Sequence, residues 1–140
     1  MSDPFKPSPW PLASLPTMTD TANLAMFTLD CSDVPALTGF YRDLLGLTVI
    51  AEGEGYAMLG KDGATPIGIG AVPDYQPPAW PDSGRKQFHF DIAATDPAAT
   101  VQRAVELGAV RPDEQPGETW TVLLDPAGHP FCVTDAANWG

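Results

Sequence analysis

The pattern of apolar and polar positions predicts two amphipathic helices. The first follows Asp33, a residue type that caps helix N-termini, and stops at Gly46, a residue type that ends helices. Between these two residues, apolar side chains recur at the spacing of a single helix face, at Leu37, Phe40, Tyr41, Leu44 and Leu45.

The second helix is predicted by the same signals. Asp96 is its N-cap, Pro97 occupies the first helical position, where proline is favoured, and Gly108 follows its end. The apolar face predicted to be buried consists of Ala98, Val101, Ala104 and Val105.

Short alternating or apolar segments around the helices predict strands. One strand precedes each helix, at 24–31 and at 87–94. Three more candidates follow each helix, at 48–53, 56–60 and 66–72 after the first, and at 109–115, 120–125 and 130–135 after the second. Each half of the chain therefore has the order βαβββ.

The two halves repeat at a steady offset. Asp96 follows Asp33 by 63 residues, and the Leu-Gly pair ending the second helix follows its counterpart by 62. We expect an irregular Pro-rich arm at 1–20 and one domain at 21–140. Its modules span about 22–72 and 87–137, joined by a loop at 73–86. The predicted fold class is α+β, in which two tandem modules form a curved mixed sheet around a cavity, with the helices on the outer face.

Composition and net charge limit the classes of function that are expected. The chain has 140 residues, of which 44% are hydrophobic and 18% charged, as expected of a globular domain. Seven Lys and Arg against 18 Asp and Glu give a net charge of −11. The sequence contains no basic stripe, so a nucleic-acid partner is not expected. The acidity is compatible with a cationic small-molecule ligand, although most acidic surfaces only confer solubility.

The remaining sequence signals concern location and cofactors. Cys31 and Cys132 form no CxxC pair and no disulfide framework, so a reducing cytoplasm is the expected compartment. No segment approaches the roughly 20 apolar residues of a membrane span, and prolines occupy the positions where a signal peptide would be apolar. The GxG at 68–70 lacks the third glycine and the following helix of a dinucleotide site.

Four segments carry a family resemblance: DCSDVPALTGFYRDLLGL, VPDYQPPAWPD, FHFDIAATDPAATVQRAVELGA and LLDPAGHPFCV. Over roughly residues 22–137 the chain resembles the vicinal oxygen chelate superfamily, which includes glyoxalases, bleomycin-resistance proteins and extradiol dioxygenases, and it most resembles the glyoxalase-like subgroup. The resemblance implies a paired βαβββ fold, often dimeric, with a pocket in the concave sheet. It does not imply one reaction, because the fold hosts metal enzymes and metal-free binding proteins.

The resemblance also implies where metal ligands would lie, at one early and one late strand position in each module. In this sequence these positions hold Met26, Gly70, His89 and Cys132. Glycine has no side chain, and a thioether is a poor ligand for hard or borderline metals, so His89 and Cys132 would form half a site at most. We therefore expect no catalytic metal and no cofactor.

The expected pocket combines polar and aromatic side chains from both modules. His89 and Asp91 share one strand face and are the candidates for acid/base catalysis, although a structural histidine held by a carboxylate fits equally well. The full predicted set is Met26, Thr28, Asp30, Tyr56, Gly70, Trp80, His89, Asp91, Trp120 and Cys132.

Several of these residues have a structural alternative. Asp30 could be a solvated or capping carboxylate, and each aromatic residue could be a core or dimer contact. Cys132 could be a small buried hydrophobe or a thiol paired with His89. His129 is expected in a turn, away from the site, and Cys31 is expected to be structural.

The sequence thus predicts a glyoxalase-like domain that binds a small organic molecule, cationic or aromatic, without a catalytic metal, as drug-binding resistance relatives do. The alternative is a lyase, isomerase or hydrolase acting on a small carbonyl compound, with His89 and Asp91 as acid and base or with an atypical metal site. A second alternative is a degenerate dimerisation module. The expected partners are a small-molecule ligand and a second copy of the chain, with no nucleic acid and no membrane.

Overall fold

The structure is a computed structural model that describes residues 24–80 and 88–139. The chain divides into two compact units, and the boundary falls between Tyr75 and Gln76, inside the predicted loop. The predicted arm at 1–20 lies outside the described residues. None of the described helices is long and apolar enough to cross a membrane.

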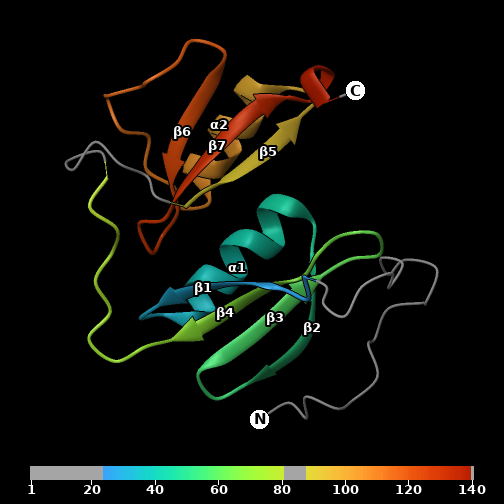
Figure 1. Cartoon of the computed structure of the whole chain (residues 1–140), viewed down its shortest axis with the longest axis vertical. Helices are drawn as coiled ribbons and strands as arrows, with labels where there is room; N and C mark the ends of the chain where they lie inside the picture. The colour runs from blue at the N-terminus through green and yellow to red at the C-terminus, as the bar shows by residue number, and fades with distance from the viewer. Residues whose placement is uncertain (1–23, 81–87, 140) are drawn as a thin grey trace. The chain divides into compact units, whose positions relative to one another are not determined.

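The first unit has the predicted order βαβββ, and its four strands form one mixed sheet. Along the chain, β1 (Phe27–Cys31) is followed by α1 (Val34–Leu45), β2 (Thr48–Gly53), β3 (Tyr56–Gly60) and β4 (Ile67–Ala71). The strand order is β1-β4-β3-β2, in which β1 and β4 are parallel and the other neighbours antiparallel (Figure 1).

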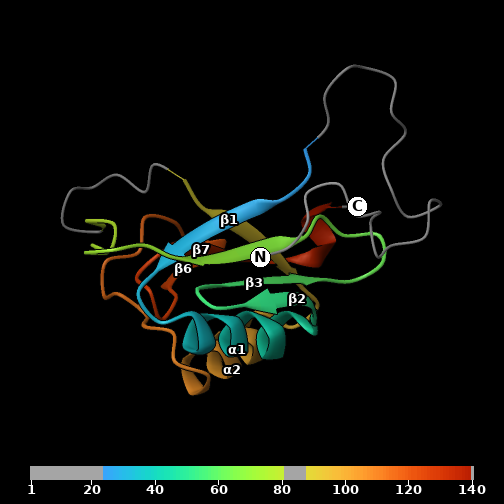
Figure 2. The same cartoon turned by 90° about the horizontal axis from the view of Figure 1, so that it is seen from below.

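Helix α1 begins and ends where the sequence predicts. The Asp33 side chain accepts a hydrogen bond of 3.0 Å from the Ala36 N–H, and Gly46 leaves the helix in the left-handed conformation with a φ of 65°. The helix lies on one side of the sheet, packs on β3 and β4, and buries Leu37, Phe40 and Tyr41 (Figure 2). The predicted first helix is confirmed.

Strand β1 shows the alternation expected of a sheet with one covered face. Leu29 and Cys31 are buried, whereas Thr28 and Asp30 are exposed. Because successive side chains of a strand point to opposite faces, Thr28 and Asp30 lie on the face away from the buried set, as predicted.

The second unit is smaller than the first. Strand β5 (Phe90–Ala94) is followed by α2 (Pro97–Glu106), β6 (Trp120–Leu124), β7 (Pro130–Asp135) and the 3₁₀ helix η2 (Ala136–Trp139). The strand order is β5-β7-β6, in which β5 and β7 are parallel, and β6 and β7 antiparallel (Figure 1).

The predicted strand at 109–115 is wrong. This segment contributes one isolated bridge, between Val110 and Leu124, so the second sheet has three strands and not four. Pro112 has no N–H for a strand ladder. Further along, the side chain of Gln115 takes the place of a neighbouring backbone, because its Oε1 accepts from the Val122 N–H at 2.8 Å and its Nε2 donates to the Val122 carbonyl at 2.9 Å.

Helix α2 starts at its predicted cap but buries less than predicted. The Asp96 side chain accepts from the Ala99 N–H at 3.1 Å, and Ala104 is fully buried. Val101 is half-buried, Ala98 is exposed and Val105 is 46% exposed, so the predicted burial of Ala98 and Val105 is wrong. The second sheet has three strands, and α2 contacts two of them, β5 and β7. This sheet covers only part of the apolar helix face that the sequence pattern predicts to be buried.

The first strands of both units also start later than predicted. Strand β1 begins at Phe27 and β5 at Phe90, so Met26 and His89 directly precede their strands. The two residues stand in equivalent places of the repeat, which agrees with the predicted duplication.

Candidate functional site

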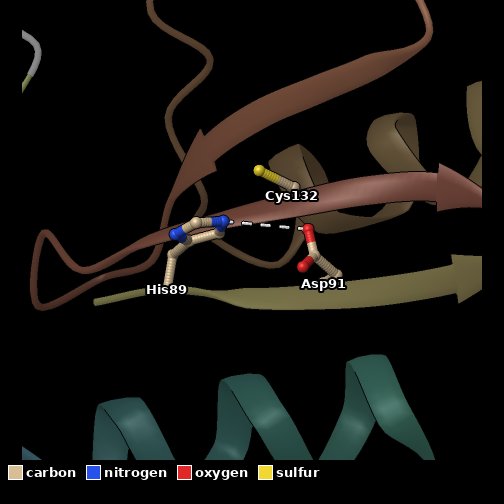
Figure 3. Close-up of side chains that lie close together, drawn as sticks. All are labelled: His89, Asp91 and Cys132. Carbon is tan, nitrogen blue, oxygen red and sulfur yellow. Dashed lines mark ion pairs between the residues drawn. The ribbon is translucent and has the colours of Figure 1, made fainter. Parts of the chain in front are cut away.

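Three chemically reactive side chains of the second unit converge above β5 and β7. Asp91 and Cys132 are direct partners in the parallel register of these strands, so their side chains lie next to each other on one face. His89 precedes Asp91 by two residues and shares that face. Its Nε2 lies 3.8 Å from Asp91 Oδ1, and the ligand atoms of all three side chains lie within 4.8 Å of one another (Figure 3).

The tight turn before β7 fixes where Cys132 enters this cluster. Asp125 is 2% exposed, and its Oδ1 accepts from the N–H groups of Ala127 and His129, both at 2.9 Å. Its carbonyl accepts from the Gly128 N–H at 2.8 Å. The predicted turn is confirmed. Strand β7 begins after it at Pro130, two residues before Cys132.

A pocket of about 420 Å³ surrounds the cluster. Two indole rings and several polar groups line it together with the three clustered side chains. The full set is His89, Asp91, Thr119, Trp120, Cys132, Thr134, Asn138 and Trp139. The pocket therefore contains four of the predicted site residues, and all of its lining residues belong to the second unit.

Four of the lining residues were missed by the sequence reasoning: Thr119, Thr134, Asn138 and Trp139. Thr134 Oγ1 donates to the Ile92 carbonyl at 2.9 Å and accepts from the Trp139 indole N–H at 2.7 Å, which ties η2 to the sheet. Strand alternation could have found Thr134, two residues after Cys132. Nothing periodic in the sequence indicates a 3₁₀ helix at the C-terminus.

Trp80 lies elsewhere than predicted. It is 6% exposed and forms a small core cluster with Val122 and Cys132, so it supports Cys132 and is not a lining residue of the pocket. Cys132 itself is 2% exposed, whereas the side chains of His89 and Asp91 are 33% and 42% exposed. The cluster is thus closed on the side of the protein core and open on the side of the pocket.

The other five predicted residues belong to the first unit: Met26, Thr28, Asp30, Tyr56 and Gly70. Their contribution to a cavity shared with the second unit stays a prediction. Met26 lies over Gly68, where an added Cβ would come within 2.9 Å of its sulfur. Tyr56 packs its ring over Gly53 and lines a separate pocket of about 290 Å³ beside α1.

The four metal positions implied by the family do not supply a ligand set. In the second unit Asp91 pairs with Cys132, and in the first unit Thr28, 63 residues earlier, pairs with Gly68. The observed register therefore makes Gly68 the counterpart of Cys132, in place of the predicted Gly70, and both positions are glycines that offer no ligand. Met26 offers only a thioether. The donors in this unit therefore do not fit a hard or borderline metal ion at these positions.

The second histidine and the second cysteine lie outside the cluster. His129 belongs to the turn, where its carbonyl accepts from the Asp125 N–H at 2.9 Å, as predicted. Cys31 is 1% exposed, and its Sγ lies 3.7 Å from the Gly70 carbonyl, to which it donates, in keeping with a structural role. Neither cysteine forms a disulfide.

Comparison with solved structures shows the same fold. An enzyme of the glyoxalase/bleomycin resistance protein/dioxygenase family from Burkholderia phytofirmans is 18% identical, covers 82% of this chain and 99% of its own, and has a TM-score of 0.65. The trypanothione-dependent glyoxalase I of Leishmania major is 14% identical, with coverages of 85% and 90% and a TM-score of 0.63.

A third neighbour is a bleomycin-binding protein from Streptomyces verticillus, solved in complex with copper(II)-bleomycin. It is 21% identical, with coverages of 83% and 98% and a TM-score of 0.52. No curated protein sequence matches the chain significantly. The family model described as a glyoxalase-like domain matches residues 26–134, most of the chain. The protein therefore belongs to the glyoxalase-like domain family, as the resemblance in its sequence predicted.

Proposed function

We propose that the protein binds a small organic molecule carrying an aromatic or cationic group in the pocket of its second unit. The observation that supports this function best is the composition of the pocket, in which the indoles of Trp120 and Trp139 accompany the carboxylate of Asp91. Apolar ring surface with a few convergent polar groups is typical of small-molecule sites.

The charge of the site favours a cation over a neutral ligand. A cation over an indole face gains about 0.5–2 kcal/mol, and a partly exposed carboxylate adds a direct counter-charge. The net charge of −11 raises the local concentration of cations around the whole chain. The Streptomyces verticillus neighbour, which holds copper(II)-bleomycin, supports the view that this fold can accommodate an organic ligand.

The test is a thermal-shift screen of aromatic amines and quaternary ammonium compounds, each paired with a neutral compound of the same shape. At ~100 times the Kd, a ligand stabilises the fold by about 2.7 kcal/mol, which is readily detected. We expect Trp120→Ala and Trp139→Ala to weaken binding about tenfold, and Asp91→Asn to remove the preference for the cation.

Phe88→Ala is the matched control, since Phe88 is a 64% exposed aromatic residue that does not line the pocket. Unchanged ligand affinity in both tryptophan variants would place the binding site elsewhere. A screen in which no compound shifts the transition would favour a degenerate module with an interaction role.

The second candidate function is acid/base catalysis on a small carbonyl compound by a lyase, isomerase or hydrolase. The observation in its favour is the pair His89 Nε2 and Asp91 Oδ1, 3.8 Å apart at the pocket. A carboxylate at this distance can orient an imidazole once a substrate closes the gap. Turnover of a carbonyl substrate should fall ~10²–10⁴-fold in His89→Ala. Retention of activity in that variant would rule out His89 as the acid or base.

A further inference from the structure

The cluster of His89, Asp91 and Cys132 unites three different donor atoms in one place. An imidazole nitrogen, a carboxylate oxygen and a sulfur lie within 4.8 Å of one another, and His89 Nε2 lies 3.8 Å from Asp91 Oδ1 (Figure 3). Zinc–ligand bonds of about 2.0–2.3 Å put two donors of one tetrahedral ion about 3.3–3.8 Å apart. The three side chains are therefore close to the spacing of a zinc site and need move only slightly to reach it.

The burial of the three residues also suits a metal ion. Cys132 is 2% exposed and packs against Trp80 and Val122, so its sulfur is held from the core side. His89 and Asp91 stand at the open side of the pocket. Three protein ligands on one side and an open fourth position on the other are typical of zinc sites that also accept an exogenous ligand.

We propose that this cluster binds a thiophilic divalent cation, with Zn²⁺ as its representative, through the imidazole of His89, a carboxylate oxygen of Asp91 and the thiolate of Cys132. The thiol loses its proton to solvent when the sulfur–metal bond forms. The fourth coordination position faces the pocket.

This site differs from the four-position arrangement that the family resemblance implies. Asp91 is not one of those positions, and it supplies the third donor, which Met26 and Gly70 cannot. All three donors come from a single unit, with Cys132 on β7, Asp91 on β5 and His89 directly before β5. A thiolate ligand favours Zn²⁺ and similar ions and disfavours Mg²⁺ and Ca²⁺, which require oxygen ligands. The inference does not rest on the organic ligand proposed above.

The test uses the full chain, freed of metal with a chelator and then titrated with Co²⁺. Thiolate-bound Co²⁺ absorbs in the near ultraviolet, and tetrahedral Co²⁺ absorbs strongly in the visible, so the spectrum reports both the sulfur ligand and the geometry. We expect one equivalent of Co²⁺ to develop both bands and Zn²⁺ to abolish them, while millimolar Mg²⁺ leaves them unchanged. The Zn²⁺ affinity is then measured by competition with a chromophoric chelator.

The chain offers a matched control for each ligand, because it contains a second cysteine and a second histidine outside the cluster. Loss of an outer-shell partner typically weakens metal affinity ~10–100-fold, and loss of a direct ligand should weaken it at least as much. We expect this loss in Cys132→Ala, His89→Ala and Asp91→Asn. The controls Cys31→Ala, His129→Ala and Asp62→Asn, the last at an exposed carboxylate of the first unit, should keep the affinity of the parent chain. The near-ultraviolet band should disappear in Cys132→Ala alone among the cysteine variants.

Circular dichroism of each variant shows whether it folds. Cys132 lies in the core, so if Cys132→Ala does not fold, the exposed substitutions at His89 and Asp91 decide the question. A chain without a thiolate band, or one whose Zn²⁺ affinity is unchanged by both exposed substitutions, would overturn the site. Binding of organic cations to the chelator-treated chain is measured separately, so failure of the metal site and failure of the proposed function give different results.

Discussion

Gly128 shows how a single residue holds the turn that positions Cys132. Its φ of 87° lies in the left-handed region, which favours glycine, and an added Cβ would approach the Cβ of Pro77 to 2.7 Å. A side chain at this position would therefore be destabilising for two reasons, namely backbone strain and a steric clash with Pro77. The buried Asp125 carboxylate depends on the same turn for its two backbone donors.

Gly63 allows the two costs to be separated, since its φ of 79° is similar but its Cβ would meet nothing within 4 Å. We expect Gly63→Ala to lower the free energy of unfolding by about 1–2 kcal/mol through backbone strain alone. Gly128→Ala should lower the free energy of unfolding by roughly 1–3 kcal/mol more than Gly63→Ala does, because the side chain of Pro77 must also move. Urea unfolding of both variants measures the difference. Equal losses of unfolding free energy in the two variants would show that Pro77 moves without an energetic cost.

At the scale of elements, the segment before β6 shows a side chain replacing a strand. Gln115 makes both hydrogen bonds with Val122 that a neighbouring backbone would make, and its Nε2 also donates to the Pro112 carbonyl at 3.0 Å. Strand β6 carries Trp120 into the pocket, so this amide supports both the edge of the sheet and the position of one indole.

Gln115→Ala should lower the free energy of unfolding by roughly 1–3 kcal/mol, because the N–H and carbonyl of Val122 lose their partners. Gln102→Ala is the control, since Gln102 is exposed on α2 and its side chain donates one long hydrogen bond, of 3.4 Å, to Glu106. Thermal unfolding of both variants, followed by titration with any ligand found in the screen, measures stability and the pocket together. If Gln115→Ala is as stable as the control, water must form the hydrogen bonds to Val122 in place of the amide, with no loss of stability.

The elements that could be predicted from the sequence are those set by local chemistry. Asp33, Asp96 and the turn at Asp125 act within four residues of themselves, so their signals are complete in the sequence. The strand expected at 109–115 does not form, because Pro112 lacks the N–H that a strand ladder needs and the side chain of Gln115 bonds to Val122 in place of a backbone. The helix η2 was missed because four residues are too few to show a period.

The candidate site was predictable only in part, for a related reason. Alternation along one strand placed His89 beside Asp91, whereas the pairing of Asp91 with Cys132 depends on a register between strands about 40 residues apart along the chain. The family resemblance supplied the neighbourhood of His89 and Cys132, but not the addition of Asp91 as a third donor. Trp80 was misplaced because an aromatic residue in a loop gives no sign of which surface it will cover.

At the scale of the whole molecule, the homodimer stays a prediction that rests on the family resemblance, which implies a fold that is often dimeric. Within the described part of the chain, β1 is an edge of the first sheet and β5 an edge of the second, and each pairs with a parallel strand on one side. The end strands of sheets are usually covered in native proteins, and a two-fold symmetric partner is one common way to cover them. Other expected features of the whole chain, such as its arm at 1–20, lie outside the described residues.

We therefore predict a homodimer in solution, with a mass twice the 14.9 kDa of one chain in sedimentation equilibrium. Because dissociation accompanies unfolding in such a dimer, the midpoint of thermal unfolding should rise with protein concentration. A monomer would instead show a midpoint that is independent of concentration and a mass of one chain across the range.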